Sequence, residues 1–323
     1  MEQKLINKIL WWIPNKKVRD FIRHYIEKVD NTYDELNQYK NIINNTYNEL
    51  NKYKNIIETF IPVKSLRFIE IMISKHCNMA CYSCNHFSQL ADEEFYDLDI
   101  LEKDLKRLSE LTNGLVEEFR ITGGEPLLNP KCAEYFILIK KYFPNSTIDL
   151  NTNGILLLKQ NDLFWETVQK YARVITISGY PLNLDIKALR DKCNSYNIPL
   201  SIYIEEGHEK KVSYKTLLDI NSKLEPEDNF YKCGPKNGNC IHLFNGKLYP
   251  CCVSANVRFF NKFFNQNYPI TSLDYLDIHQ KKVRGPDIAY FLSRPIPFCK
   301  YCIQPNKIIG EWKPSKKDIN EYI

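Results

Sequence analysis

The spacing of apolar positions predicts alternating strands and helices from residue 66 onward. Short apolar runs, of the kind that is buried on both faces, predict strands at Leu66–Ser74, Glu118–Thr122, Thr147–Asn151, Arg173–Ser178 and Pro199–Ile204. Between them lie helical patterns at Leu98–Leu111, Cys132–Tyr142, Leu163–Tyr171 and Ile186–Tyr196. Regular alternation of this kind indicates an α/β fold around a parallel sheet, either a barrel or an open sheet.

The alternation stops near Glu225, and a cysteine-rich stretch follows. Asn245-Gly246 separates two short apolar runs, which predicts a tight β-hairpin. We expect residues 228–310 to form a small second domain after a first domain over residues 64–225. Residues 311–323 are expected to end in a helix that begins at Ser315, with Asp318 completing a capping box.

A repeat precedes the predicted sheet. The stretch from Asn31 to Ile43 recurs from Asn45 to Ile57, an offset of two heptads. The heptad positions d are then Leu36, Ile43, Leu50 and Ile57, and positions a are Tyr33, Lys40, Tyr47 and Lys54. Residues 31–60 are therefore predicted to form a short coiled coil that can set a homodimer; the alternative is a helical spacer.

Residues 1–30 are predicted to form two short amphipathic helices around Pro14. Basic side chains and tryptophans share the segment 4–26, a composition that suits a helix lying on a membrane surface. The alternative is a helix that packs on the protein core or on a partner. The run Trp11-Trp-Ile-Pro-Asn-Lys-Lys-Val-Arg19 also resembles short basic leaders on bacterial enzymes of surface-polysaccharide assembly.

Charge and hydropathy restrict the class of protein. There are 44 Lys and Arg against 39 Asp and Glu, and the net charge of +5 matches the basic excess of residues 4–26 alone. A nucleic-acid-binding surface over the rest of the chain is therefore not expected. No apolar run approaches the length of a membrane span, and no cleavable signal pattern opens the chain, so we expect a cytoplasmic protein, with the leader reaching the inner membrane face.

The cysteines are clustered. In a reducing compartment, grouped cysteines indicate metal binding or catalysis rather than disulfides. Nine of the eleven fall into groups, and the groups are Cys77, Cys81 and Cys84; Cys233, Cys240, Cys251 and Cys252; and Cys299 and Cys302. The other two, Cys132 and Cys193, lie in helical patterns and are expected to be small buried side chains.

The first group directly follows the first predicted strand. Three thiolates on one loop can bind three corners of a [4Fe–4S] cluster, which leaves one iron for a substrate or cofactor. The end of a barrel strand is also where such folds place their active sites. A zinc ion with His86 as its fourth ligand is the alternative.

These motifs resemble the signature of the radical S-adenosylmethionine superfamily. Cys77-x3-Cys81-x2-Cys84 has the cysteine spacing of that family. Gly123-Gly124-Glu125-Pro126, after the second strand, is similar to its GGEP motif, and Thr152-Asn153-Gly154, after the third, is similar to its TNG motif. The resemblance covers residues 64–225 and implies a partial (β/α)6 TIM-like barrel.

The resemblance also implies the cofactors and their contacts. A [4Fe–4S] cluster on Cys77, Cys81 and Cys84 would bind S-adenosylmethionine and cleave it reductively, so that a 5′-deoxyadenosyl radical takes hydrogen from a substrate. An electron donor such as flavodoxin or ferredoxin would supply the electron. The side chains and backbone expected at S-adenosylmethionine are Gly123, Gly124, Glu125, Asn153 and Ser178.

One position departs from the family pattern. The family has an aromatic residue directly before the third cysteine, where it packs on adenine. Here that position is Ser83, and Tyr82 comes one residue earlier. Tyr82 is retained as a candidate for the cofactor site, with His86 and Phe87 as possible substitutes.

The later cysteines resemble the auxiliary-cluster domains called SPASM or twitch, and the shorter twitch form fits the number of cysteines. The resemblance implies a second [4Fe–4S] cluster on Cys233, Cys251, Cys299 and Cys302, with Cys240 competing with Cys233 for the first position. Cys252 is expected to be a bystander, and a structural zinc at the same four ligands is the alternative.

These features lead to an expected function. We expect hydrogen abstraction from a sugar or polysaccharide precursor, which ends in oxidation or epimerisation. One alternative is modification of a peptide or protein; the coiled-coil repeat stands where such enzymes carry a peptide-binding domain. A second alternative is a non-catalytic iron–sulfur or zinc scaffold. The residues identify no catalytic acid or base.

Overall fold

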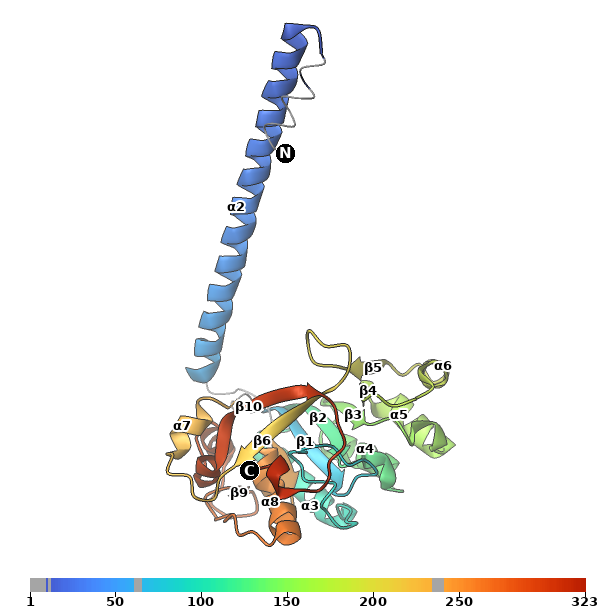
Figure 1. Cartoon of the computed structure of the whole chain (residues 1–323). Coiled ribbons are helices and arrows are strands. Elements are labelled where there is room, and N and C mark those ends of the chain that lie inside the picture. Colours follow the sequence, from blue (N-terminus) through green and yellow to red (C-terminus); the bar gives the residue numbers. More distant parts are fainter. Residues whose placement is uncertain (1–9, 11–12, 61–65, 234–240) are drawn as a thin grey trace. The chain divides into compact units, whose positions relative to one another are not determined.

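The structure is a computed structural model that describes residue 10 and residues 13–60, 66–233 and 241–323. It consists of two compact units, Met1–Ile61 and Pro62–Ile323 (Figure 1). No helix within the described residues combines the length and the apolar character that crossing a membrane requires.

The first unit contains one long helix, α2, over Lys16–Phe60. The helix continues through the predicted boundary between the leader and the repeat, because its 45 residues cover both from Lys16 onward. Most of the leader before Pro14, including Lys4 and Lys8, lies outside the described residues. In the single chain, apolar side chains along α2 are exposed to solvent, among them Leu36, Ile43 and Leu50.

The second unit is built on a mostly parallel sheet. Five consecutive parallel strands form its larger part, and they are β1 (Leu66–Ser74), β2 (Val116–Gly123), β3 (Thr147–Thr152), β4 (Val174–Ser178) and β5 (Leu200–Tyr203). The order in the sheet is β5-β4-β3-β2-β1-β7-β8-β9. The predicted α/β fold and all five predicted strands are confirmed, with ends that differ by at most two residues.

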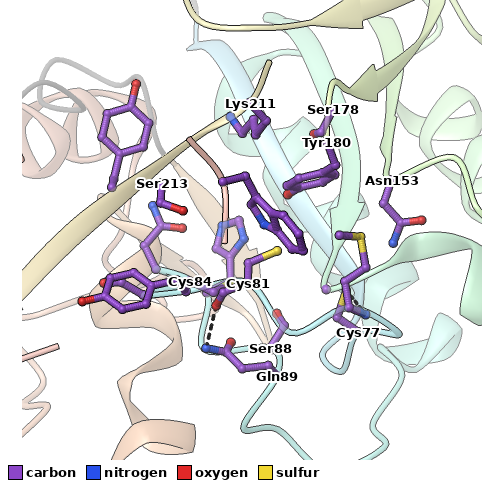
Figure 2. A pocket seen from close by; sticks show the side chains of 18 of the residues that line it. Cys77, Cys81, Cys84, Ser88, Gln89, Asn153, Ser178, Tyr180, Lys211 and Ser213 are labelled. Carbon is purple, nitrogen blue, oxygen red and sulfur yellow. Dashed lines mark hydrogen bonds between the residues drawn. The ribbon is translucent and has the colours of Figure 1, made fainter. Parts of the chain in front are cut away.

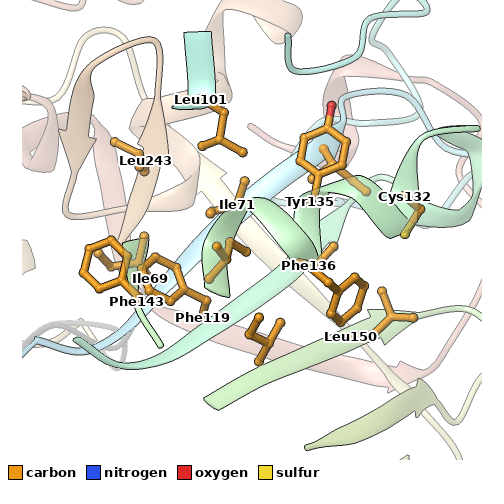
Figure 3. Close-up of a cluster of buried hydrophobic side chains, with 14 of the residues drawn as sticks. Ile69, Ile71, Leu101, Phe119, Cys132, Tyr135, Phe136, Phe143, Leu150 and Leu243 are labelled. Atoms are coloured by element: carbon orange, nitrogen blue, oxygen red, sulfur yellow. The ribbon is translucent and has the colours of Figure 1, made fainter. Parts of the chain in front are cut away.

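Helices connect the parallel strands. They are α3 (Leu98–Thr112), α4 (Cys132–Tyr142), α5 (Asp162–Tyr171) and α6 (Ile186–Ser195), close to the four predicted helical patterns. Figure 3 shows Tyr135 and Phe136 of α4 over strand side chains that include Ile71, Phe119 and Leu150. These apolar contacts form the main core of the unit and hold the strand ends in fixed positions.

The sixth parallel strand comes from the cysteine-rich segment. β7 (His242–Phe244) pairs with β1 in parallel, and it continues through the Asn245-Gly246 turn into antiparallel β8 (Lys247–Tyr249), which confirms the predicted hairpin. Both turn residues have positive φ, 49° and 72°, as a type I′ turn requires. The short strand β9 (Leu276–Asp277) closes this edge of the sheet.

A buried carboxylate ties the hairpin to the helix α3. Asp104 is 2% exposed, and it accepts hydrogen bonds from the Tyr96 hydroxyl at 2.5 Å and from the Gly246 backbone N–H at 2.7 Å. The Nε2 atom of His279 lies 2.7 Å from the other oxygen. The cysteine-rich segment is therefore packed against the first five strands, and both belong to one compact unit.

The remaining elements surround the cysteines of the later groups. They are α7 (Pro226–Phe230), α8 (Cys252–Phe264), α9 (Gly285–Leu292) and a 3-10 helix, η3 (Pro297–Tyr301). A separate two-stranded ribbon pairs β6 (Val212–Leu218) with β10 (Cys302–Glu311) in antiparallel orientation.

The end of the chain differs from the prediction. A helix was expected from Ser315, but β10 extends to Glu311 and the only helical turn after it, among the described residues, is a 3-10 turn, η4, at Ile319–Glu321. Asp318 caps this turn by accepting from the Asn320 backbone N–H at 2.9 Å. Ser315 instead donates its backbone N–H to Ala80, which fixes the segment to the loop after β1 and prevents an earlier helix start.

We expect Phe136→Ala to lower the free energy of unfolding by about 3–5 kcal/mol, because it leaves a cavity in a close-packed core. Phe136 has no exposed surface. Leu163→Ala on α5 is the matched control, since Leu163 is 60% exposed and should change the free energy by less than about 0.5 kcal/mol. Chemical denaturation followed by circular dichroism measures both; equal losses would contradict this description of the core.

Candidate functional site

The three cysteines of the first group line one cavity of about 620 Å³. The loop that carries Cys77, Cys81 and Cys84 follows β1 directly. Figure 2 shows the three thiols below Tyr180 and Lys211, with Asn153 to one side. The cavity also contains the predicted residues Tyr82, Gly123, Gly124, Asn153 and Ser178. The structure thus brings together the loop and the ends of β2, β3 and β4.

The three thiols affect one another electrostatically. Burial raises the pKa of Cys77, and the neighbouring Cys84, Glu125 and Cys81 raise it further. Burial, with Cys81, raises the pKa of Cys84 to about 11. Burial also raises the pKa of Cys81, although Trp312, Tyr180 and Lys211 act in the opposite direction. The thiols therefore keep their protons at neutral pH without a cation, and metal binding would release protons.

The glycine turn after β2 packs against the loop after β1. A Cβ atom on Gly124 would lie 2.2 Å from the His76 carbonyl oxygen, and one on Gly123 would lie 2.5 Å from that of Ser74. The backbone N–H of Gly124 donates to Ser74 at 2.8 Å, and that of Glu125 donates to His76 at 3.1 Å. The sequence suggested that the glycines allow close approach to a cofactor. In the structure, the close approach is to the protein's own backbone.

Glu125 is buried below this turn and does not line the cavity. Its carboxylate accepts from the Thr152 hydroxyl at 2.6 Å, from the Asn153 backbone N–H at 2.8 Å and from the Leu127 backbone N–H at 3.1 Å. Burial raises the pKa of Glu125, and these hydrogen bonds oppose the rise. The Glu125 side chain thereby joins the ends of β2 and β3.

Asn153 connects the β3 end to the cysteine loop. Its side-chain nitrogen donates to Oδ1 of Asn78 at 2.8 Å, and its own Oδ1 accepts from the Ile155 backbone N–H at 3.0 Å. Asn78 follows Cys77, so this hydrogen bond restrains the start of the loop. Of the predicted cofactor residues, Asn153 is thus fixed by both of its polar atoms.

The position before the third cysteine has an unusual backbone. Ser83 has φ of 49°, in the left-handed region that non-glycine residues rarely adopt. Tyr82 does line the cavity, and Nζ of Lys313 lies 4.0 Å from the centre of its ring. Phe87, considered as a substitute, has no exposed surface and packs on Phe260 and Tyr322. His86 remains at the cavity wall.

Several lining residues escaped the sequence analysis because they come from segments without a motif. Trp312 and Gln304 belong to the region of β10 and the residues after it. Tyr180 follows β4, and its ring contacts that of Trp312 in an edge-on arrangement. Burial and the nearby Cys81 raise the pKa of Tyr180 well above its usual value, so its hydroxyl stays protonated.

The cavity suits a polar ligand as well as a metal cluster. The hydroxyl of Ser88 and Oε1 of Gln89 are buried there and have no hydrogen-bond partner among the described residues. The side-chain nitrogen of Gln89 donates to the Cys81 carbonyl at 3.1 Å, so its free oxygen has a fixed direction (Figure 2). Three thiols with adjoining unsatisfied polar atoms match the donor set that an iron–sulfur cluster and a polar cofactor require.

A second, smaller pocket contains the later cysteines. Its lining includes Cys233, Cys251, Cys299 and Cys302, together with Cys252. Burial and the nearby Cys251 raise the pKa of Cys299 to about 12, and burial with Cys251, Cys233 and Cys299 raises that of Cys302. The four thiols expected to bind a second cluster are therefore neighbours.

The competing ligand Cys240 lies outside the described residues. Asn229, which is 2% exposed, donates to the Cys299 carbonyl at 2.9 Å and accepts from the Gln304 backbone N–H at 3.3 Å. It thereby holds η3 and β10 around the second pocket. Cys132 and Cys193 are buried in α4 and α6, as expected for small core side chains.

Comparison with known families gives a match over the segment that carries the cysteine loop. Residues 71–214 match the family model described as Radical SAM superfamily. This segment contains the cysteine loop, the glycine turn and the ends of β3 and β4.

Curated relatives match over a part of their length. The GTP 3′,8-cyclase of Chlorobaculum tepidum is 31% identical over 103 residues, which are 32% of this chain and 30% of the relative. That of Helicobacter pylori strain HPAG1 is 33% identical over 92 residues, 28% of this chain and 29% of the relative. The chain thus spans about 30% of the length of these relatives.

Solved structures of similar fold include BtrN in complex with AdoMet and 2-DOIA, with a TM-score of 0.47 and 14% identity over 74% of this chain and 93% of that one. Native anSMEcpe with bound AdoMet has a TM-score of 0.43 and 15% identity over 73% and 82%. Both TM-scores are below 0.5, so the family assignment rests on the sequence match.

We expect Glu205→Gln to lower the free energy of unfolding by about 1–3 kcal/mol at pH 7, because it leaves the cation of Lys211 without its partner. Glu205 is 8% exposed and also accepts from the Val212 backbone N–H at 3.3 Å. Burial raises the pKa of Glu205, but the hydrogen bond and charge of Lys211 lower it more, so the net shift is downward.

A lowered pKa means that this stabilisation is present above the unfolded pKa and is lost as the pH falls through the folded one. Denaturation at pH 7 and at pH 3 should therefore show a smaller difference between wild type and Glu205→Gln at the lower pH. Asp92→Asn, which breaks an ion pair with Lys262 that is more than 70% exposed on both sides, is the control and should change little. An equal effect of both variants would refute the assignment.

Proposed function

Because residues 71–214 belong to the Radical SAM superfamily, we propose that the chain is an enzyme that abstracts a hydrogen atom from a carbohydrate-type substrate and oxidises or epimerises it. The observation that carries the proposal is the meeting of Cys77, Cys81 and Cys84 with the glycine turn in one cavity. When bound, the [4Fe–4S] cluster and S-adenosylmethionine supply a 5′-deoxyadenosyl radical that takes the hydrogen atom.

The chain's own residues would bind and orient the cofactors and exclude water from the site. Cys77, Cys81 and Cys84 would hold the cluster, and Ser88 and Gln89 would offer polar atoms to the cofactor next to it. Trp312 and Tyr180 cover Cys81 with aromatic surface, which keeps water away from a thiolate. Tyr180 or Trp312 would supply the adenine contact that Ser83 cannot make.

The substrate class is proposed from polar side chains of the cavity wall that are not part of the cysteine loop. Four of them offer both hydrogen-bond donors and acceptors, and they are Glu205, Lys211, Ser213 and Gln304. A ligand with several hydroxyl groups can add hydrogen bonds to such a set, in which Glu205 and Lys211 already pair with each other. The resemblance of the basic leader to those of polysaccharide enzymes points in the same direction.

The second pocket is proposed to bind an auxiliary [4Fe–4S] cluster through Cys233, Cys251, Cys299 and Cys302. Oxidation of a CH–OH group to a carbonyl removes two electrons. The deoxyadenosyl group would take a hydrogen atom from carbon, a cluster held by these four cysteines would accept the second electron, and a base would take the hydroxyl proton. Epimerisation instead needs a hydrogen atom to be returned to carbon.

We expect about eight irons per chain in reconstituted protein if both pockets hold a cubane, and about four in Cys81→Ala. Wild type incubated with S-adenosylmethionine and dithionite should release 5′-deoxyadenosine, whereas Cys81→Ala should lose at least about 100-fold of that rate because its cluster is incomplete. Iron analysis and liquid chromatography measure both.

Cys132→Ala is the matched control, since Cys132 is buried in α4 and does not line the cavity, and it should retain iron and activity. Release of no 5′-deoxyadenosine by iron-replete wild type would favour a non-catalytic scaffold. Deuterium transfer from C–D-labelled nucleotide sugars into 5′-deoxyadenosine tests the substrate class; transfer from a labelled peptide instead would favour peptide modification. Product analysis in D₂O separates epimerisation, which incorporates deuterium at carbon, from oxidation.

The helix α2 is proposed to pair with a second copy of itself. Between residues 22 and 50, heptad positions a and d form an apolar series that Lys40 alone interrupts, at Ile22, Ile26, Val29, Tyr33, Leu36, Ile43, Tyr47 and Leu50. The side chains from Val29 onward in this series are 61–66% exposed in the single chain. A lone helix of this length gains little stability from its own hydrogen bonds, and a two-stranded coiled coil would bury this stripe.

We expect wild type to sediment as a dimer and Leu36→Lys/Ile43→Lys to sediment as a monomer at the same concentration, because two d positions become charged. Gln38→Lys/Asn45→Lys adds the same charge on the opposite face of the helix and should remain dimeric. Sedimentation velocity distinguishes the two states. Equal behaviour of the two double variants would contradict a dimer through this seam.

A flavodoxin or ferredoxin as electron donor, and a peripheral contact of residues 4–26 with a membrane surface, remain predictions. The second can be tested by flotation of wild type with anionic vesicles, because basic side chains such as Arg19 and Arg23 would be attracted to them.

A further inference from the structure

We propose that His86, His242 and Cys252 form a binding site for a single zinc-class metal ion, between the two cysteine pockets. One possible ligand atom from each residue, a ring nitrogen or the sulfur, lies within 4.8 Å of those of the other two. Two imidazoles and one thiolate are ligands that zinc and cobalt(II) accept readily.

Three segments that are distant in the sequence supply these residues. His86 follows the cysteine loop, His242 is the first residue of β7, and Cys252 is the first residue of α8. His242 and Cys252 are 2% and 3% exposed, and the two imidazole rings lie 5.4 Å apart in an edge-on arrangement. β7 is paired in the sheet, and α8 packs in a second cluster of buried apolar side chains. Two of the ligands are therefore held by rigid elements.

Glu70 supplies the group that a metal-binding histidine usually has behind it. It lies opposite His242 in the β1–β7 pairing, and its Oε2 is 3.0 Å from Nε2 of His242. A carboxylate in this position fixes the tautomer and orientation of the ring. Nε2 of His86 lies 3.9 Å from the same oxygen, which is too long for a hydrogen bond, so Glu70 orients His242 and adds its negative charge near His86.

The site stands in the wall between the two pockets. His86 and Glu70 line the large cavity, whereas Cys252 lines the second pocket beside Cys251. Three protein ligands leave a tetrahedral ion one further position. That position would be on the His86 side, where a water or a hydroxyl group of a ligand in the large cavity could occupy it. Cys252 was expected from the sequence to be a bystander; its sulfur lies within 4.8 Å of a ring nitrogen of each histidine, and the residue also lines the second pocket.

Cobalt(II) is the probe. Full-length protein with its clusters reconstituted is incubated with Co²⁺ and desalted, and metal content and absorption are recorded. We expect about one cobalt per chain with tetrahedral d–d bands and a thiolate-to-cobalt charge-transfer band. Added Zn²⁺ should remove both sets of bands. Cobalt bound without a thiolate band, or no cobalt bound, would overturn the proposal.

The variants locate the ion. Cys252→Ser should lose the charge-transfer band, and His242→Ala should weaken cobalt binding at least about 100-fold. Glu70→Gln should keep the band but weaken binding about 10- to 100-fold, because only the orientation of His242 is lost. Cys193→Ala and His208→Ala, which remove a thiol and an imidazole elsewhere, should behave as wild type. An unchanged band in Cys252→Ser would place the thiolate elsewhere and refute the site.

Two further readouts keep the result independent of folding and of the proposed reaction. His86→Ala removes the most exposed ligand, whose side chain is 21% accessible, and should weaken cobalt binding even if His242→Ala fails to fold. Iron content and 5′-deoxyadenosine release are recorded for every sample. Loss of cobalt with unchanged iron would support the site, whereas loss of radical chemistry with retained cobalt would count against the proposed function alone.

Discussion

The close approach of the ends of β1 and β2 is the constraint on which the first cavity depends. Gly123 and Gly124 have no Cβ, so the turn can donate to Ser74 and His76 just before the cysteine loop begins. Glu125 then turns inward, and its buried carboxylate holds the end of β3. A side chain at Gly124 would push these strands apart and would move the loop relative to Asn153. The glycine motif therefore acts first on the protein's own geometry.

The C-terminal segment extends the sheet that the first five parallel strands form. β7 adds a sixth parallel strand beside β1, and Asp104 fixes its hairpin to α3. The same segment brings the second group of thiols close to the first cavity, and Asn85 and Gln304 line both pockets. Packing of the two halves into one unit thus places two sulfur-rich pockets next to residues that line both of them.

The elements with a local signature could be predicted from sequence, and those that depend on distant partners could not. The strand Leu66–Ser74 and the helix Cys132–Tyr142 were predicted with their observed bounds, since apolar periodicity marks them. The three motif loops were recognisable because each has unusual residues at fixed spacing. The strand β10 has no alternating pattern, and it forms because β6 lies alongside it. His242 gave no signal, because its meeting with Glu70 depends on strand order.

A residue near the C-terminal end, Tyr322, contacts the cysteine loop. The Tyr322 hydroxyl donates to the Cys84 carbonyl at 3.4 Å, across 238 residues of sequence. At a synthesis rate of about 5–20 residues per second, this separation corresponds to roughly 10–50 s on the ribosome. During that interval the thiols of the nascent chain are present without the contact from Tyr322. Until translation reaches this tyrosine, the cysteine loop lacks the hydrogen bond that restrains it at the Cys84 carbonyl.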